Sequence, residues 1–173
     1  RVYYVDDITF VGAAGGGGGG GTAPTDAPTT VIPAGATIIY SDAVSVTGFN
    51  PFPNWGQATQ FSEVTIANNK SLRYTALNYE GIDWTTAAID VSTKATVHFD
   101  LWSPDLTSVK VFLISTATAQ ETGVTVPLTA GIWNSVDIPL SSFTAPDRTK
   151  IDQIKLDAQP ASGTLYVDNI YFW

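Results

Sequence analysis

The residues of this chain whose types and spacing first indicate chemistry are His98, Asp100 and Trp102. An imidazole beside a carboxylate can act as a catalytic pair when a nucleophile completes it. The chain has no Cys and no nucleophile-elbow motif, and His98 is its only histidine. Side chains two apart on a strand share a face without necessarily touching. The sequence therefore argues against a catalytic triad at this position.

Carboxylates offer two other kinds of chemistry, glycoside hydrolysis and metal binding. Hydrolysis needs two carboxylates at a fixed separation; Glu63, Glu80 and Glu121 permit such a pair, but no local spacing indicates one. One histidine and no cysteine cannot build an ordinary zinc site. Calcium prefers oxygen ligands, and Asp42 and Asp168 would share a structural calcium ion if the first and last predicted strands pair. Two solvated aspartates are the alternative.

Aromatic side chains beside planar polar ones favour a third chemistry, the binding of sugars. The C–H groups of a sugar ring stack on an aromatic face, while its hydroxyls bond to planar polar groups. Alternation places His98, Asp100 and Trp102 on one face of a predicted strand. A second outward row, on another strand, consists of Lys155, Asp157 and Gln159. If the two strands lie in one sheet, their rows form one polar surface flanked by aromatic rings.

Four further aromatic residues bear on this surface. Trp84, together with Trp102, is a leading candidate platform for a sugar ring, and ordinary packing is the alternative for both because indoles are usually well buried. Tyr79 is expected to border the surface. Trp55 lies in a loop crowded with turn formers, where it either binds ligand or pins the loop. Trp133 opens a cleanly alternating run and is predicted to belong to the core.

Short alternating runs divided by turn residues predict that strands carry these side chains. No helical period is present from Val31 onward, which is typical of an all-β fold. We expect a two-sheet antiparallel β-sandwich of the jelly-roll type. The predicted strands are Thr37–Ser41, Gln60–Ala67, Ser71–Leu77, Ile82–Thr86, Ala95–Trp102, Ser108–Ser115, Gly123–Leu128, Asn134–Pro139, Gln153–Ala158 and Thr164–Phe172.

The two ends of the chain carry near copies of one strand. Tyr4–Phe10 and Tyr166–Phe172 are identical at five of seven positions, which indicates a tandem array. A glycine run, Gly15–Gly21, and the Pro/Thr segment after it are typical of an interdomain linker. We therefore predict the C-terminal strand of a preceding module in residues 1–11, a linker in residues 12–30 and one module in residues 31–173. A long surface loop is the alternative to the linker.

Composition narrows the classes of partner. A formal net charge of -8 argues against nucleic acid and anionic membranes, and it counts mildly against a strongly anionic polysaccharide. The absence of cysteine excludes a disulfide framework. We expect an exported, extracellular bacterial protein whose signal peptide would lie upstream of the array. A cytosolic protein without cysteine would have the same composition.

Several motifs together resemble the galactose-binding-like β-sandwich modules of secreted polysaccharide-degrading proteins, especially those of marine and gut Bacteroidetes. The resemblance covers essentially all of Thr37–Trp173. The motifs are Ile39–Ala43, Asn54–Gln57, Leu77–Gly81, Phe99–Asp105, Val111–Ser115, Trp133–Leu140 and Tyr166–Phe172.

This resemblance implies a non-catalytic carbohydrate-binding module with a ligand face lined by aromatic residues, and commonly a structural calcium near the paired termini. Such modules are appended, often in tandem, to glycoside hydrolases such as laminarinases. The resemblance thus predicts a polysaccharide partner, with a β-glucan such as laminarin as the first choice, and no catalytic residues. Two rival hypotheses remain: a catalytic polysaccharide lyase or hydrolase domain, and a structural spacer or adhesion module. No motif identifies the glycan.

Overall fold

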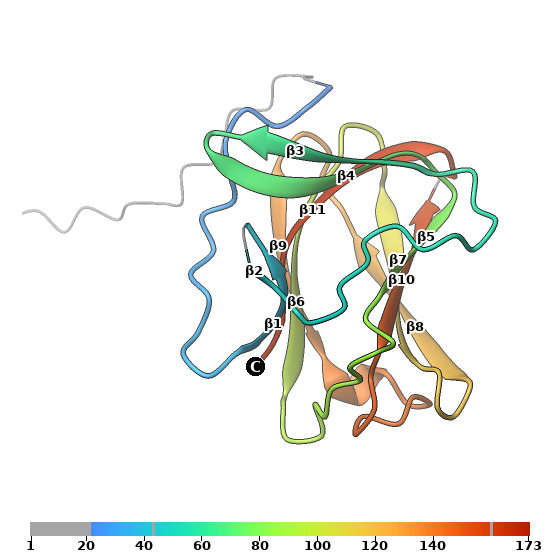
Figure 1. The fold of residues 1–173 in the computed structure, drawn as a ribbon. Coiled ribbons are helices and arrows are strands. Elements are labelled where there is room, and N and C mark those ends of the chain that lie inside the picture. Colours follow the sequence, from blue (N-terminus) through green and yellow to red (C-terminus); the bar gives the residue numbers. More distant parts are fainter. Residues whose placement is uncertain (1–21, 43, 160) are drawn as a thin grey trace, which may run out of the picture.

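Two antiparallel β-sheets pack face to face in the computed structural model, which describes residues 22–42, 44–159 and 161–173 (Figure 1). The predicted all-β sandwich is therefore confirmed. The strands are β1 (Thr37–Ser41), β2 (Val44–Ser45), β3 (Gln60–Ile66), β4 (Asn69–Leu77), β5 (Tyr79–Asp83), β6 (Thr96–Trp102), β7 (Ser108–Ser115), β8 (Gln120–Pro127), β9 (Trp133–Pro139), β10 (Gln153–Gln159) and β11 (Gly163–Phe172), with one short 3-10 helix at Leu140–Ser142. Within the described residues, no helix is long and apolar enough to cross a membrane.

The larger sheet, which we name sheet A, is built around the C-terminal strand β11. Strands β4 and β6 flank β11, with β3 beyond β4 and β9 beyond β6. The short strand β1 pairs with the far end of β11, from Thr37 opposite Phe172, and β2 pairs with β1. The two terminal strands of the module therefore do lie side by side.

The smaller sheet, sheet B, has the order β5-β10-β7-β8 and is antiparallel throughout. Its inner face meets that of sheet A, and period-two alternation supplies the side chains. Strand β7 contributes the fully buried Val109, Val111 and Leu113, which belong to one hydrophobic cluster with Phe99 and Leu101 of β6. Burying each large apolar side chain stabilises the fold by about 1.5–3 kcal/mol, so this shared core holds the two sheets together.

The chain crosses from sheet A to sheet B between Leu77 and Tyr79. Register with β10 then fixes the two faces of β5, because Tyr79 lies opposite Asp157 and Gly81 lies opposite Lys155. These residues face outward. The residue between Tyr79 and Gly81, Glu80, points into the sandwich and is fully buried.

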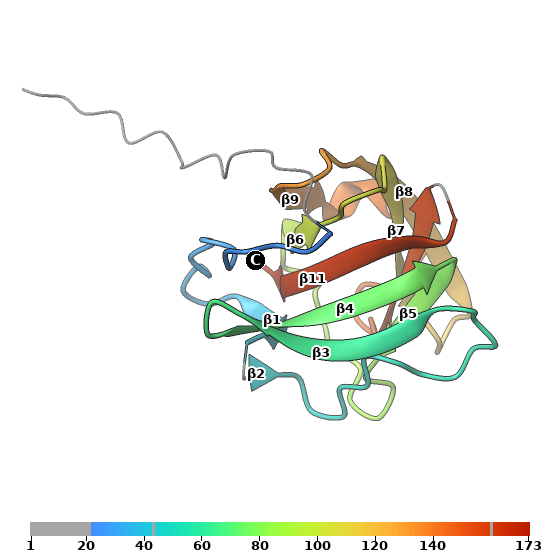
Figure 2. The ribbon, with the colours of Figure 1, turned by 90° about the horizontal axis from the view of Figure 1, so that it is seen from above.

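The segment before β1 runs along the outer face of sheet A (Figure 2). Thr30 Oγ1 donates a hydrogen bond to Asp100 Oδ1 at 2.9 Å, and Trp133 Nε1 donates to the Asp26 carbonyl at 2.6 Å. Residues 22–30, predicted to be part of a linker, therefore contact the sandwich. The predicted strand in residues 1–11 and the glycine run lie outside the described residues, and the domain boundary stays a prediction.

Candidate functional site

The single surface expected from the rows His98–Trp102 and Lys155–Gln159 does not exist. Strand β6 lies in sheet A and β10 lies in sheet B, so the two rows belong to different sheets. Alternation did place the β6 row correctly on the outward side of its strand. That row is nonetheless covered, and the exposed fractions of His98, Asp100 and Trp102 are only 3%, 1% and 3%. The predicted exposure of these three side chains is wrong.

The prediction that Trp84 is an exposed platform is also wrong, because its side chain is 0% exposed and lies in the core. Its indole Nε1 donates a hydrogen bond to the Ile151 carbonyl at 3.0 Å. A buried indole that satisfies its only donor in this way contributes to packing. Trp133 is half-buried and packs against the small cluster around Trp102 on the outer side of sheet A.

His98 takes part in a network of charged side chains that lies beneath the segment before β1. Its Nδ1 lies 2.9 Å from Asp137 Oδ1, its Nε2 lies 3.4 Å from Asp100 Oδ1, and its ring stacks on Tyr171 with centroids 4.5 Å apart. Burial lowers the pKa of His98, but hydrogen bonds and charges from Asp100 and Asp137 outweigh burial and raise the pKa overall. The network explains how sheet A tolerates these buried polar groups.

Asp42 and Asp168 lie on the paired strands β1 and β11 or directly beside them, as the calcium hypothesis requires. Protein donors already engage both carboxylates: Asp168 accepts from Asn169 N at 2.7 Å and Ser71 Oγ at 3.2 Å, and Asp42 accepts from Lys70 N at 3.0 Å. Burial raises the pKa of Asp168 to about 6. Within residues 22–42, 44–159 and 161–173, no group of three or more His, Cys, Asp or Glu could hold a metal. The pair therefore fits calcium poorly, and calcium binding stays a prediction.

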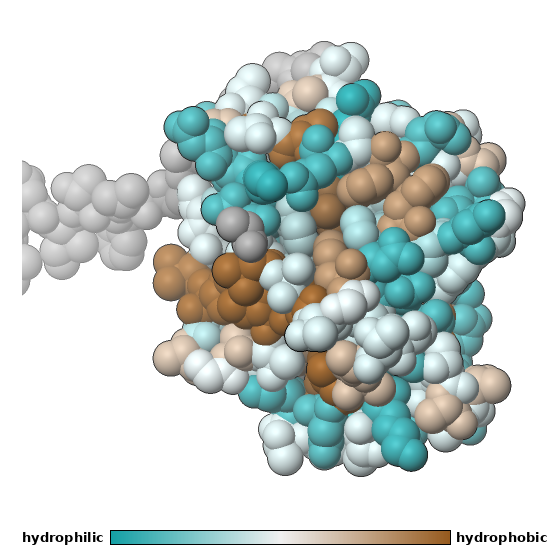
Figure 3. Space-filling model, viewed as in Figure 1, coloured by the Kyte–Doolittle hydropathy of each residue, from teal (hydrophilic) through white to brown (hydrophobic). Residues whose placement is uncertain are grey.

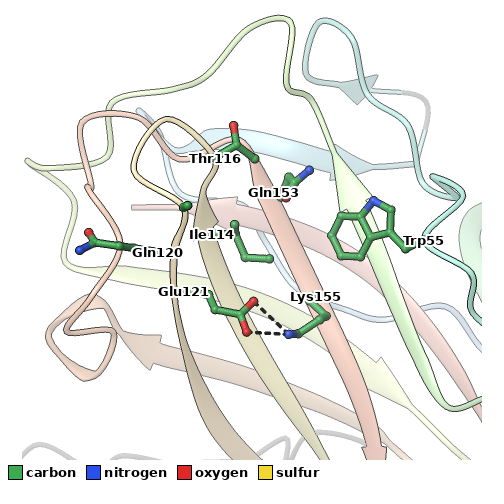
Figure 4. Close-up of a pocket in the computed structure, with 8 residues that line it drawn as sticks. Trp55, Ile114, Thr116, Gln120, Glu121, Gln153 and Lys155 are labelled. Atoms are coloured by element: carbon green, nitrogen blue, oxygen red, sulfur yellow. Dashed lines mark hydrogen bonds and ion pairs between the residues drawn. The ribbon is translucent and has the colours of Figure 1, made fainter.

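The outer face of sheet B, which we name the B face, combines aromatic and polar side chains at the surface (Figure 4). Four of the predicted site residues, Trp55, Tyr79, Lys155 and Asp157, lie on or beside it. Gln159 is the last residue of β10, and its side chain lies outside the described part. Burial raises the pKa of Asp157, while the positive charge of Lys155 opposes that rise.

Trp55 reaches the B face from the loop between β2 and β3. Its six-membered ring lies against Gly81 of β5, where a Cβ atom would come within 2.6 Å of the ring. The Tyr79 hydroxyl donates to the Trp55 carbonyl at 2.8 Å, and Trp55 N donates to Gln57 Oε1 at 2.7 Å. Only glycine at position 81 permits this close approach of an indole to a strand.

Phe112 of β7 is the second aromatic ring of the B face. Lys155 Nζ lies 3.9 Å from its centroid and Lys110 Nζ lies 4.9 Å away, so two cations cover the ring. Lys155 also forms an ion pair with Glu121 of β8, at 2.8 and 2.9 Å. A Cβ atom at Gly123 would come within 2.5 Å of Phe112, so a strand glycine accommodates this ring as well.

An open hollow of about 510 Å³ lies between Trp55 and the ends of β7 and β8 (Figure 4). Its lining supplies an indole, two amides, a hydroxyl, a carboxylate and an ammonium group. The lining residues are Trp55, Ile114, Thr116, Ala119, Gln120, Glu121, Gln153 and Lys155. An aromatic platform with convergent planar polar groups can bind a sugar ring by stacking and hydrogen bonding.

Sequence reasoning missed most of this lining, including Glu121 and Gln153, and it also missed Phe112 on the B face. One signal was available in the alternation of Ser108–Ser115, which puts Lys110, Phe112 and Ile114 outward. A second signal was the glycine inside each of two strands, because strand-interior glycine often marks close approach by another group.

Apolar residues gather on another part of the surface, seen at the left of the space-filling view (Figure 3). Large hydrophobic side chains exposed among the described residues include Val31 at 88%, Val44 at 55%, Phe52 at 38% and Trp173 at 44%. Val31 and Val44 are aliphatic and offer no π-face for stacking, and the two aromatic side chains, Phe52 and Trp173, are not among the residues that line the hollow. The B face is therefore the better candidate site.

Comparison with known proteins supports the fold. No family model and no curated protein sequence matches the chain. The family 11 carbohydrate-binding module of a cellulosomal cellulase of Clostridium thermocellum superposes with a TM-score of 0.60 at 19% identity, covering 82% of this chain and 95% of that chain. A family 11 module from the same organism, in complex with a β-1,3-1,4-mixed-linked tetrasaccharide, superposes with a TM-score of 0.55 at 20% sequence identity, covering 81% of this chain and 96% of that chain.

A mutant of a family 29 carbohydrate-binding module, from work on ligand recognition by that family, gives a TM-score of 0.59 at 13% identity, covering 81% of this chain and 92% of that chain. Each of these three structures matches the chain over most of its own length. At such identities the likeness shows the fold, a two-sheet β-sandwich like that of family 11 and family 29 modules.

Proposed function

We propose that this protein binds a polysaccharide non-catalytically on the B face, with Trp55 as the stacking platform. The observation that carries the proposal is the hollow in which the indole meets Gln153, Glu121 and Lys155. The fold is shared with carbohydrate-binding modules, and this supports the same proposal. Two of those modules belong to family 11, and one of the two was solved in complex with a β-1,3-1,4-mixed-linked tetrasaccharide.

A neutral β-glucan, such as laminarin or a mixed-linked glucan, is the ligand we propose first. The formal net charge of -8 disfavours strongly anionic polysaccharides. On the B face, the ammonium group of Lys155 is already paired with Glu121 and packed on Phe112, so it is not free to bind a sugar carboxylate. Hydroxyl groups and the apolar face of a pyranose match what remains, namely the indole and the amides.

Binding is favoured over hydrolysis because the hollow lacks a pair of carboxylates. Glu121 is the single acidic residue among its lining residues, and Lys155 holds both of its oxygens. Glycoside hydrolysis requires two carboxyl groups that flank the scissile bond. A catalytic role would therefore need residues that this hollow does not supply.

The weak binding expected of a single open site also bears on the parent protein. Open sites of this kind bind weakly, so linked copies raise the effective affinity through local concentration. We propose an extracellular parent protein that joins this module to a tandem copy and a catalytic domain, and thereby holds the enzyme on its substrate. The near copy of the terminal strand at Tyr4–Phe10 supports the tandem arrangement.

Electrophoresis through gels that contain laminarin, mixed-linked β-glucan, agarose or alginate tests the proposal. We expect retardation by a β-glucan and normal mobility in alginate. A reducing-sugar assay on the same polysaccharides should stay at background. Normal mobility in every gel would reject sugar binding, and release of reducing ends would restore the enzyme hypothesis.

A further inference from the structure

Glu80 is a buried carboxylate directly behind the candidate site. It lies on β5 between the outward residues Tyr79 and Gly81, points into the sandwich and is 0% exposed. Its Oε1 accepts hydrogen bonds from Gly81 N and Gln57 Nε2, both at 3.0 Å, and Gln57 Nε2 also lies 3.3 Å from Oε2. Burying a carboxylate is costly unless hydrogen bonds or an opposite charge replace the lost solvation, and here hydrogen bonds from Gln57 and Gly81 do so.

Gln57 links this carboxylate to the loop that carries the platform. Its Nε2 donates to the Pro53 carbonyl at 2.7 Å as well as to Glu80, so both amide hydrogens are engaged. Its Oε1 accepts from the backbone N of Trp55 at 2.7 Å. The orientation of one side-chain amide thus sets the path of the chain on both sides of residue 54.

Other contacts hold different parts of the same loop. Tyr74 Oη donates to the Pro51 carbonyl and Tyr79 Oη donates to the Trp55 carbonyl, each at 2.8 Å. Only the Gln57 bond engages the Trp55 amide among the hydrogen bonds of the described residues. The rotation of the Trp55 peptide, and with it the indole over Gly81, therefore depends on how Gln57 is held.

We propose that Glu80 is a positioning residue that acts through Gln57 to hold the Trp55 platform, and that its protonation weakens glycan binding. This inference rests on the proposed function of the B face. Glu80 does not touch the hollow, since it is not among the lining residues and lies on the opposite side of β5.

The chemistry of the acceptor explains the pH dependence. Burial raises the pKa of Glu80 to about 7, although hydrogen bonds from Gln57 and Gly81 oppose the rise. Tyr74 on β4 is the titratable group that faces it, with a pKa raised first by burial and then by the charge of Glu80, so Tyr74 stays neutral. Among the described residues, no Lys, Arg or His forms an ion pair with Glu80.

Protonation turns one acceptor oxygen of Glu80 into a donor. Gln57 Nε2 lies within 3.3 Å of both oxygens, so a hydroxyl there would confront an N–H group. Protonation of either oxygen also removes the negative charge that strengthens the hydrogen bond from Gln57, so Gln57 is held less firmly and its hold on the Trp55 amide loosens. We therefore expect weaker glycan binding at pH 5.5 than at pH 8.

Three variants test the inference, with mixed-linked β-glucan as the probe at pH 5.5, 6.5, 7.5 and 8. Wild-type affinity should fall about two- to tenfold from pH 8 to pH 5.5, the range expected for one lost hydrogen bond. Glu80→Gln and Gln57→Ala should bind weakly at every pH, with a flat profile. Asp168→Asn, which alters a buried carboxylate of sheet A, should keep the wild-type profile. Thermal melts identify any variant that is unfolded.

An NMR titration without glycan separates this inference from the proposed function. The backbone amide signal of Trp55 should shift with pH in the wild type and in Asp168→Asn, with a midpoint near 7, and should stay fixed in Glu80→Gln. If no glycan binds but this signal titrates, the positioning role stands and the proposed function fails. If the glycan binds but Glu80→Gln and Gln57→Ala match the wild type, or the Trp55 amide does not titrate, the inference is overturned.

Discussion

Replacing Glu80 by glutamine should change how the stability of the protein depends on pH. The pKa of Glu80 is raised from 4.5 to about 7 in the folded protein, mainly by burial. The folded state therefore binds this proton more tightly than the unfolded state. By linkage, the contribution of Glu80 to stability is fully present below about pH 4.5 and is lost as the pH rises through about 7. The difference between the two pKa values corresponds to at most about 3 kcal/mol.

Glutamine cannot ionise, so Glu80→Gln removes this dependence while it keeps the shape of the side chain. Urea denaturation at pH 5, 6, 7 and 8 gives the free energy of unfolding of both proteins. The variant should gain on the wild type by up to about 3 kcal/mol between pH 5 and pH 8. Glu63→Gln, at an exposed carboxylate that pairs with Lys70, is the control; because exposed ion pairs contribute at most about 1 kcal/mol, its stability should differ from that of the wild type by no more than this at any pH. Parallel curves for Glu80→Gln would refute the assignment of a buried, proton-binding Glu80.

The remaining predictions concern packing, the platform and calcium. Gly81→Ala should weaken glycan binding toward the level of Trp55→Ala, because the added Cβ would meet the indole at 2.6 Å and displace it. Gel retardation measures this loss, and unchanged retardation would contradict the packing of Trp55 on Gly81. Trp84→Ala should destabilise the fold by about 3–5 kcal/mol and leave binding by the folded fraction unaltered, which denaturation and titration together check. The sequence prediction of calcium at Asp42 and Asp168 implies a lower melting temperature in chelator, an effect that Asp42→Ala should abolish; identical melting temperatures with and without chelator would reject it.

The layered fold was largely predictable because alternation is a local property of the chain. Strand β1 matches its predicted range, and β6 carries Val97, Phe99 and Leu101 inward as expected. Strand β5 was predicted from Ile82, three residues late, because Tyr79 follows a change of sheet that no local pattern marks. Local periodicity shows which side of a strand is apolar, but it does not show which sheet the strand joins.

The candidate site was only half predictable for a related reason. Tyr79, Lys155 and Asp157 were grouped with His98, although β6 and β10 belong to different sheets. The outward row of β6 became buried because the segment before β1 crosses it, with Thr30 bonded to Asp100. Coverage by a distant segment is a tertiary effect, and alternation along a single strand carries no information about it.

The position of Trp55 on the B face had a partial signal in the sequence. Its loop was open to two interpretations, pinning or binding, and the structure shows contacts that pin the loop around an indole that also lines the hollow. The glycine at position 81, in the middle of a strand, was the sequence signal for a ring packed on the sheet. Only the tertiary structure shows that the ring of Trp55 is the one that packs on Gly81.

Calorimetric titration of mixed-linked β-glucan into Trp55→Ala and Trp173→Ala, beside the wild type, tests the central claim most directly. Both changes remove an indole near the surface, but Trp55 lines the hollow of the B face while Trp173 follows β11 in sheet A. By analogy with aromatic pairs, stacking on a sugar ring should contribute about 0.5–1.5 kcal/mol, so Trp55→Ala should weaken binding about 2- to 13-fold and Trp173→Ala should bind like the wild type. Equal affinity in all three proteins, or a loss confined to Trp173→Ala, would contradict the placement of the glycan site on the B face.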